Sequence, residues 1–115
     1  MKGELAIYSI EFSLRIISYY KWLTEVKREY VMARQILRSG TSIGANIHEA
    51  EYAISKADFI NKIQIAAKEA NETEYWLIIL KQSGFFDESY NDLKPLLKSL
   101  IRMLTATLKT SKNGK

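Results

Sequence analysis

Apolar and small residues recur along most of the chain at alternating spacings of three and four. This 3.5-residue repeat is typical of helices packed side by side in a bundle. No stretch shows the sustained alternation, bounded by hairpin turns, that marks strands. The pattern therefore predicts an all-α fold. The three clearest seams are Ala33, Ile36, Gly40, Ile43, Ile47, Ala50 and Ile54; Phe59, Ile63, Ala66, Ala70, Thr73, Leu77 and Leu80; and Leu93, Leu97, Leu100, Leu104 and Thr107.

The boundaries of the third helix carry recognisable capping signals. Ser55, with Asp58 three residues later, is typical of an N-cap. Ile54 and Phe59 have the spacing of a hydrophobic staple around that cap. Gly84 suits the left-handed residue that follows a helix, and we expect the next residue, Phe85, to fold back on Leu80. These signals predict a helix over about 56–83.

The other boundaries are marked less clearly. The segment 20–30, YKWLTEVKREY, has no glycine or proline, and only Thr24 offers a cap. An unbroken helix over 5–53 would be roughly 70 Å long, too long for so small a domain, so we place a break near 24–27. Asp87 is a good N-cap for the last helix, in which Pro95 predicts a kink or a restart. The four predicted helices span about 4–23, 27–53, 56–83 and 88–110.

The first predicted helix has two apolar stripes, although a helix of a small bundle needs only one to face the core. The second stripe predicts a surface that binds a partner, and self-association is the favoured form. The alternative is that the aromatic side chains form only the core and its rim. The stripes are Ile7, Ile10, Leu14 and Ile17, and Leu5, Tyr8, Phe12, Tyr19 and Leu23. The candidate interface residues are Tyr8, Phe12, Tyr19, Tyr20 and Trp22.

Composition narrows the class of protein. The 115 residues suit one domain, and 47% hydrophobic with 26% charged residues is ordinary for a globular protein. The chain has no cysteine, which excludes disulfides, thiolate zinc sites and cysteine nucleophiles. The beginning of the chain does not resemble a signal peptide, and no apolar run approaches the roughly 20 residues that span a bilayer. We therefore expect a cytoplasmic protein with no membrane partner.

The segment RSGTSIGANIHEA, residues 38–50, has the composition of a phosphate-binding loop. A Walker-type loop, however, needs four residues between its glycines and a lysine after them, whereas Gly40 and Gly44 enclose three residues and no lysine follows. Gly40 lies in the apolar seam between Ile36 and Ile43, which predicts the close approach of a second helix. We expect the hydroxyl groups and Asn46 to form hydrogen bonds between helices. A local helix break near 39–42 is the alternative.

Metal and acid–base chemistry have little support in the residues. The chain has one histidine, and no glutamate lies three residues before it, so the di-iron and metalloprotease patterns are both absent. An acid–base pair of His48 with Glu49 or Glu51 is an alternative, but no convergent nucleophile, base or metal set accompanies it. We expect a non-enzymatic protein without a metal or cofactor.

A cluster of glutamates in the third helix is open to two interpretations. Glu69, Glu72 and Glu74 could act as paired catalytic carboxylates. Alternatively, they form ion pairs with Lys68, Arg34 and Arg38, which we favour.

The basic residues at the end of the chain favour an anionic partner. No acidic residue follows Asp92, whereas Lys94, Lys98 and Arg102 lie four residues apart on one helical face. Such a stripe can contact phosphates without reading bases, although a solvated helix face explains the same pattern equally well. The net charge of +4 permits either interpretation. The candidate nucleic-acid-binding residues are Lys94, Lys98, Arg102, Lys109, Arg34 and Arg38.

Residues 35–86 resemble a family of small bacterial four-helix bundle proteins first named from open reading frames within intervening sequences of 23S ribosomal RNA genes. The motif S-I-x-x-N-I-x-E over 42–49 and the motif E-x-x-E-T-x-Y-W over 69–76 carry this resemblance. It implies a helix-packing role for the residues at and near these motifs. They are Gly40, Ser42, Gly44, Asn46, Glu49, Glu69, Glu72 and Trp76.

The resemblance implies a single up-down-up-down four-helix bundle that assembles into a homo-oligomer, a pentameric ring. The family includes accessory proteins of diversity-generating retroelements, which bind a reverse transcriptase and nucleic acid through a basic surface. It has no established catalytic residues, so the resemblance transfers none. The expected partners are further copies of the chain, RNA or DNA, and a reverse transcriptase or other protein. The alternative is a protein-interaction scaffold that binds no nucleic acid.

Overall fold

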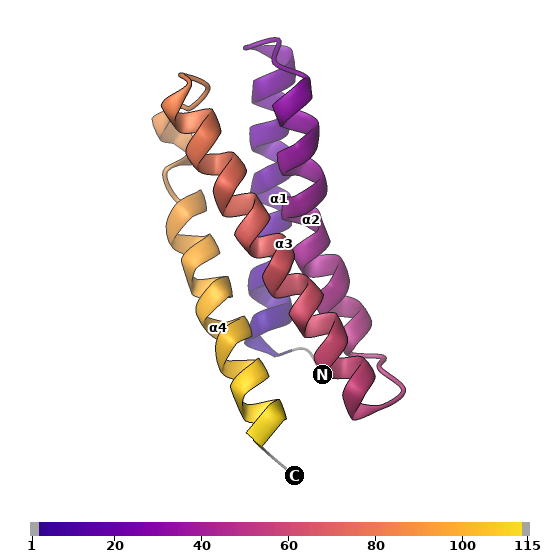
Figure 1. The fold of residues 1–115 in the computed structure, drawn as a ribbon. Coiled ribbons are helices and arrows are strands. Elements are labelled where there is room, and N and C mark those ends of the chain that lie inside the picture. Colours follow the sequence, from indigo (N-terminus) through magenta and orange to yellow (C-terminus); the bar gives the residue numbers. More distant parts are fainter. Residues whose placement is uncertain (1–2, 114–115) are drawn as a thin grey trace.

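The computed structural model describes residues 3–113, which form an antiparallel bundle of four long helices (Figure 1). The helices are α1 (Glu4–Glu25), α2 (Val31–Ala50), α3 (Lys56–Gln82) and α4 (Leu93–Asn113), with a short 3₁₀ turn η1 (Glu88–Tyr90) before α4. Each helix packs against the next one in the chain, and α4 also packs against α1. No strand occurs among the described residues, so the predicted all-α fold is confirmed.

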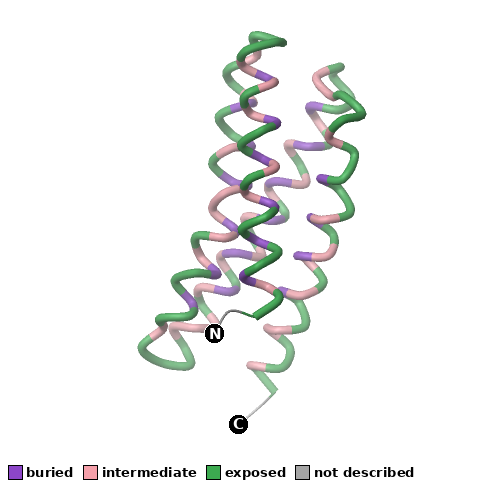
Figure 2. Tube along the Cα trace, turned by 180° about the vertical axis from the view of Figure 1, so that it is seen from behind, coloured by how far each residue is buried: buried purple, intermediate pink, exposed green. Residues whose placement is uncertain are grey.

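The core lies along the predicted apolar seams. Every seam position of α2 from Ala33 to Ala50 is buried, as are Ile63 to Leu80 in α3 and Leu93 to Leu104 in α4. In Figure 2 the buried positions form inward-facing lines along the helices. Phe59 and Thr107 are only half-buried. Ile54 lies outside the core, because α2 ends at Ala50 and leaves this side chain 93% exposed. The staple predicted between Ile54 and Phe59 is therefore wrong.

The predicted capping of α3 is otherwise confirmed at both ends. The Ser55 hydroxyl oxygen accepts a hydrogen bond from the Asp58 backbone N–H at 3.0 Å. At the other end Gly84 has a φ of +91°, the left-handed conformation that glycine adopts without strain. The Phe85 N–H then donates to the Leu80 carbonyl oxygen at 2.8 Å, as in a Schellman motif.

The junction between α1 and α2 lies later in the chain than predicted. α1 continues to Glu25, and α2 begins at Val31 rather than near residue 27. Thr24 is not a cap, because its hydroxyl donates to the Tyr20 carbonyl of its own helix. Instead the Glu29 carboxylate accepts from the backbone N–H groups of Met32 and Ala33. Glutamate is uncommon as a helix-capping residue, so the sequence pattern did not identify Glu29 as the cap of α2.

The start of the last helix also differs from the prediction. Asp87 caps η1, since its carboxylate accepts from the Ser89 N–H at 3.0 Å, and α4 begins five residues after the predicted position 88. Pro95 lies in the first turn of α4, where a backbone N–H would have no acceptor within the helix. Proline, which lacks this N–H, is therefore tolerated there. Pro95 therefore marks a restart of the helix and not a kink.

The stripe of α1 predicted to bind a partner is largely the one that the bundle buries. Phe12 and Tyr19 are 0% exposed and belong to the core, so these two interface assignments are wrong. Tyr20 and Trp22 are half-buried against the core, and Tyr8 is exposed. The other stripe faces outward and forms the apolar face of α1, defined as Ile7, Ile10, Leu14 and Ile17.

Candidate nucleic-acid interface

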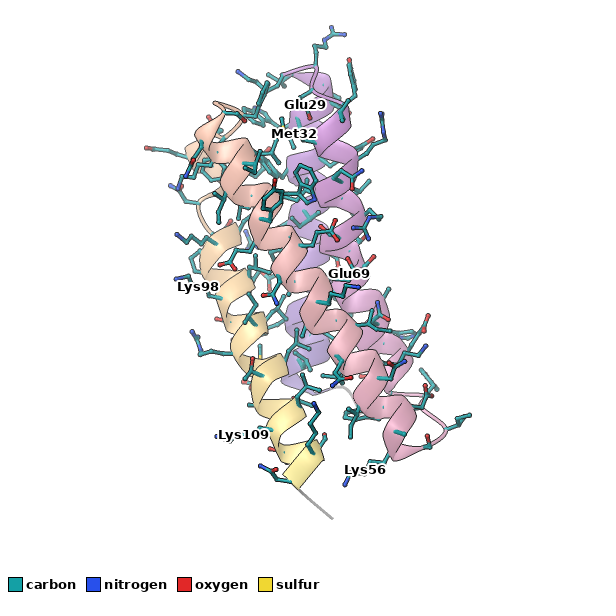
Figure 3. All side chains as sticks on the ribbon, in the orientation of Figure 1. Glu29, Met32, Lys56, Glu69, Lys98 and Lys109 are labelled. Carbon is teal, nitrogen blue, oxygen red and sulfur yellow. The ribbon has the colours of Figure 1, made fainter. Side chains whose placement is uncertain are left out.

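The outer side of α4 carries a row of cations. Because Leu93, Leu97, Leu100 and Leu104 turn into the core, the side chains that follow them along the helix point outward. We call Lys94, Lys98, Arg102 and Lys109 the basic face of α4, and all four are exposed. Figure 3 shows Lys98 and Lys109 on the same side of the helix.

These cations are not neutralised by ion pairs. Within residues 3–113, none of the four forms an ion pair with a carboxylate, and Arg102 donates only to the Ser99 hydroxyl oxygen at 3.3 Å. No acidic residue follows Asp92 in the sequence. The basic face is therefore a local excess of positive charge available to an anion.

The other two candidate cations are not brought to this face. Arg34 and Arg38 lie on α2, whereas α4 packs against α3 and α1. The Arg38 guanidinium donates to the Glu69 carboxylate at 3.1 Å and also to Glu72. Its charge is thus compensated within the bundle, as the predicted ion pairing requires.

The ion pairs of Arg38 also involve a tryptophan. The Trp76 indole N–H donates to the same Glu72 carboxylate at 3.2 Å. The hydrogen bond from Arg38 lowers the pKa of Glu72, and the same bond raises the pKa of Arg38. Glu72 is therefore held ionised at neutral pH, which suits a structural anion and not a general acid. Figure 3 places Glu69 on α3, facing α2.

A buried hydrogen bond lies beside this ion-pair network. The Thr73 hydroxyl donates to the Ser39 hydroxyl oxygen at 2.9 Å, and both residues are fully buried. The apolar seam predicted the burial of Thr73 but not its partner. The expected interhelical hydrogen bond is therefore confirmed for Ser39. It is wrong for Thr41, Ser42 and Asn46, because these side chains donate to carbonyl oxygens of α2 itself.

The two glycines of α2 lie where α1 packs tightly against it. A Cβ atom built on Gly40 would lie 3.0 Å from Cγ1 and Cγ2 of Ile16, and one on Gly44 would lie 3.3 Å from the hydroxyl oxygens of Ser9 and Ser13. α2 is continuous through both positions, so neither a phosphate-binding loop nor a break near 39–42 exists. The prediction of close helix packing at Gly40 is confirmed.

The residues around the single histidine take part in local contacts. The His48 ring lies 5.4 Å from the Tyr52 ring, and the Glu49 carboxylate accepts from the Lys62 ammonium at 3.1 Å. In the described part of the chain, no group of three or more histidine, aspartate or glutamate side chains is arranged to hold a metal ion.

A cavity of about 370 Å³ opens between α3 and α4, beside the basic face. Lys94 and Lys98 line it from α4, and Lys81 lines it from the end of α3. Sequence reasoning missed Lys81, since only the α3–α4 contact brings this residue next to the other two lysines.

None of the helices over residues 3–113 is both long and apolar enough to cross a membrane.

A family model described as 23S rRNA-intervening sequence protein matches residues 4–106. A crystal structure of a protein of unknown function from the S23 ribosomal protein family, from Bacteroides thetaiotaomicron, is 50% identical in sequence and superposes with a TM-score of 0.89. The similarity covers 92% of this chain and 96% of that one. No curated protein matches the chain.

Proposed function

The chain belongs to the 23S rRNA-intervening sequence protein family, and we propose that it is a non-enzymatic helical bundle that binds RNA or DNA nonspecifically. The observation that supports this proposal is the basic face of α4, whose four cations are exposed and have no carboxylate partner within residues 3–113.

The chemistry of this face suits a phosphate backbone. From Lys94 to Lys109, a helix rising about 1.5 Å per residue extends for roughly 22 Å, so the face can meet several successive phosphates. Three of the four cations are lysines, whose compact ammonium groups attract phosphate without the planar fork that arginine presents to a base edge. The proposed binding is therefore electrostatic and independent of sequence.

Reversing the charges of the basic face tests this proposal. We expect the variant Lys94→Glu, Lys98→Glu, Arg102→Glu to bind a fluorescein-labelled RNA at least about tenfold more weakly at low salt, because attraction to phosphate becomes repulsion at three positions. The slope of log affinity against log salt is expected to flatten by about two units, because the variant neutralises fewer phosphates and releases fewer counterions. Fluorescence anisotropy titrations at two or more salt concentrations measure both quantities.

A matched control separates this face from net charge. The variant Lys21→Glu, Lys27→Glu, Lys68→Glu changes the net charge by the same amount at exposed positions on α1, the following turn and α3. Its affinity is expected to fall by much less. Equal reductions in affinity for the two variants, or no binding by the parent protein, would contradict the proposal.

We further propose that the protein self-associates through the apolar face of α1, as a pentameric ring by analogy with the family. Ile7, Ile10 and Leu14 are each more than half exposed, which is unusual for adjacent large apolar residues on one helix. Light scattering is expected to give the mass of a multimer. The variant Ile10→Gln, Leu14→Gln should shift the mass towards one chain, because burying each native side chain contributes about 1.5–3 kcal/mol. A light-scattering mass equal to one chain for the parent protein would contradict this proposal.

The apolar face of α1 also favours a second candidate function, a protein-interaction scaffold in which the basic residues serve only solubility. In that case a protein partner, such as a reverse transcriptase, would cover this face. Recovery of a specific partner after nuclease treatment, together with loss of that partner in the variant Ile10→Gln, Leu14→Gln, would support the scaffold. The RNA titration above distinguishes the two functions.

A further inference from the structure

The cavity between α3 and α4 is lined by both apolar and cationic residues. Ile78 of α3, Pro95 of α4 and Phe86 of the connection contribute apolar walls, and Lys81, Lys94 and Lys98 contribute ammonium groups. Ile78 is 47% exposed although it is a large aliphatic residue. This combination suits a ligand that has both an apolar flat part and negative charge.

The charges around the cavity favour an anion. Three lysines line it against one acidic residue, Glu74. Two of these lysines, Lys94 and Lys98, also begin the basic face of α4, so the positive charge of the cavity continues along the helix. A polyanion bound along that face would therefore pass the mouth of the cavity.

Phe86 is placed to stack with a flat ligand. Its ring is held by an edge-on contact with the buried ring of Tyr19, with the centroids 6.0 Å apart. The Lys81 ammonium lies 5.0 Å from the Phe86 centroid, over the ring. Because Lys81 is exposed and both residues line the cavity, a ligand can take the place of the ammonium on the ring while Lys81 turns to a phosphate.

We propose that this cavity receives an unpaired base of single-stranded nucleic acid, while Lys81, Lys94 and Lys98 bind the adjacent phosphates. This inference rests on the proposed nucleic-acid binding and adds a preference for single strands. Bases of a duplex are paired and stacked internally, whereas every unpaired base offers a face to an aromatic side chain.

The size of the cavity favours a nucleotide over a peptide helix. A volume of about 370 Å³ is near the lower end of the range for small-molecule sites, which is about 300–1,000 Å³. The lining residues extend over 74–81 on α3 and 91–98 before and within α4, which is about two helical turns on each side. Two turns of a helix about 10 Å wide occupy on the order of 850 Å³, more than twice the volume of the cavity, whereas a single base is small enough for it.

The test compares three probes of the same length on the intact protein. They are a labelled 12-nucleotide oligothymidylate, the same backbone with abasic sites in place of its central bases, and a 12-base-pair duplex. We expect the base-bearing strand to bind about fivefold to tenfold more tightly than the abasic strand, which is the lower end of what a single base–aromatic stack supplies. The affinity for the duplex is expected to be the same in the parent protein and in the cavity variants, because paired bases do not enter the cavity.

Variants of the cavity walls assign this advantage to the site. Ile78→Gln removes an apolar wall without changing the charge and is expected to reduce the advantage of the base-bearing strand to less than about twofold. Its affinity for the abasic strand should be unchanged. Phe86→Leu keeps most of the apolar volume but removes the ring, and it is expected to have the same effect. Ile54→Gln, an exposed position in the α2–α3 loop, is the matched control, and circular dichroism checks that each variant is folded.

The outcomes distinguish this inference from the proposed function. Salt-dependent binding with equal affinity for the base-bearing and abasic strands would overturn the base site and leave backbone binding intact. Failure of all three probes to bind at low salt would overturn both. An acidic amphipathic peptide that binds in an Ile78-dependent manner, when the oligonucleotides do not, would replace the base site with a peptide site.

Discussion

Replacing Gly40 with leucine is expected to destabilise the bundle by about 3 kcal/mol, because the position has no room for a side chain. A Cβ atom alone would lie 3.0 Å from two carbons of Ile16, and these carbons belong to a fully buried side chain that cannot turn away into solvent. Leucine adds three more carbons at the same place. α1 and α2 must then move apart, which exposes the core on both sides of the contact. Urea unfolding monitored by circular dichroism measures the change.

Two companion variants separate overpacking from other effects. Ala45→Leu places the same side chain on the exposed side of α2 and is expected to change the free energy of unfolding by less than about 0.5 kcal/mol. Gly40→Ala should be less harmful in an Ile16→Ala background than in the parent, because the shortened side chain lacks all three carbons that the added Cβ would contact. If Gly40→Leu unfolds no more easily than the parent, close packing at Gly40 is wrong.

Replacing Tyr19 with alanine is expected to cost about 4 kcal/mol, the range observed for removing a large aromatic side chain from a core. Tyr19 is fully buried and contacts the rings of Trp22, Phe86 and Tyr90, with centroids between 5.0 and 6.1 Å away. Its hydroxyl donates to the Phe85 carbonyl oxygen at 2.6 Å, which ties α1 to the α3–α4 connection. Urea unfolding measures the destabilisation, and the half-buried control Tyr20→Ala should cost clearly less.

The variant Tyr19→Phe isolates the hydroxyl group. At neutral pH it is expected to lose about 1 kcal/mol, the net contribution of one hydrogen bond. Burial raises the pKa of Tyr19 above its ordinary value, with a smaller contribution from Tyr90. As the pH rises above about 10, the unfolded parent chain ionises at this position while the folded chain does not. The parent therefore loses stability that the phenylalanine variant keeps, and the gap between the two narrows. A gap that widens with pH would contradict this assignment.

The same aromatic cluster couples stability to the proposed base site. Phe86 contacts Tyr19 on one side and lines the cavity on the other, so the fold of the connection determines where the ring is presented. Tyr90 and Trp22 pack against Tyr19, and their own centroids lie 5.7 Å apart. Variants of Tyr19 are therefore unsuitable for testing the cavity, whereas Ile78 is suitable because it lies on the surface of α3.

Local sequence patterns were sufficient for much of the fold. The spacing of apolar residues identified four helices and nearly all buried positions of α2, α3 and α4, because burial along a helix repeats with the period of the backbone. In α1 it missed three of the six buried residues, Ala6, Ser9 and Ile16. The caps of α3 at Ser55 and Gly84 were predictable as well, since each depends on one or two residues and their immediate neighbours. The exposure of the basic residues on α4 follows from the same periodicity.

Other features depended on how the helices rotate and pair. α1 has two apolar stripes, and its own sequence does not say which one faces α2 and α4; the bundle buries Phe12 and Tyr19 and leaves Ile10 and Leu14 outside. The bond between Ser39 and Thr73 joins residues 34 positions apart. Glu29 caps α2 only because the chain turns through Arg28 with a positive φ.

For the candidate sites, too, some features follow from the residue pattern and others only from helix packing. The residue pattern alone identifies a four-helix bundle with a row of cations on its last helix, because both properties repeat with the helical period. The packing of the four helices is needed to show that Arg38 pairs with Glu69 and Glu72, and that Lys81 and Phe86 join Lys94 and Lys98 around one cavity. The physical reason is that side chains on different helices meet according to the rotation and crossing of those helices, which packing of the whole core sets and no single segment encodes.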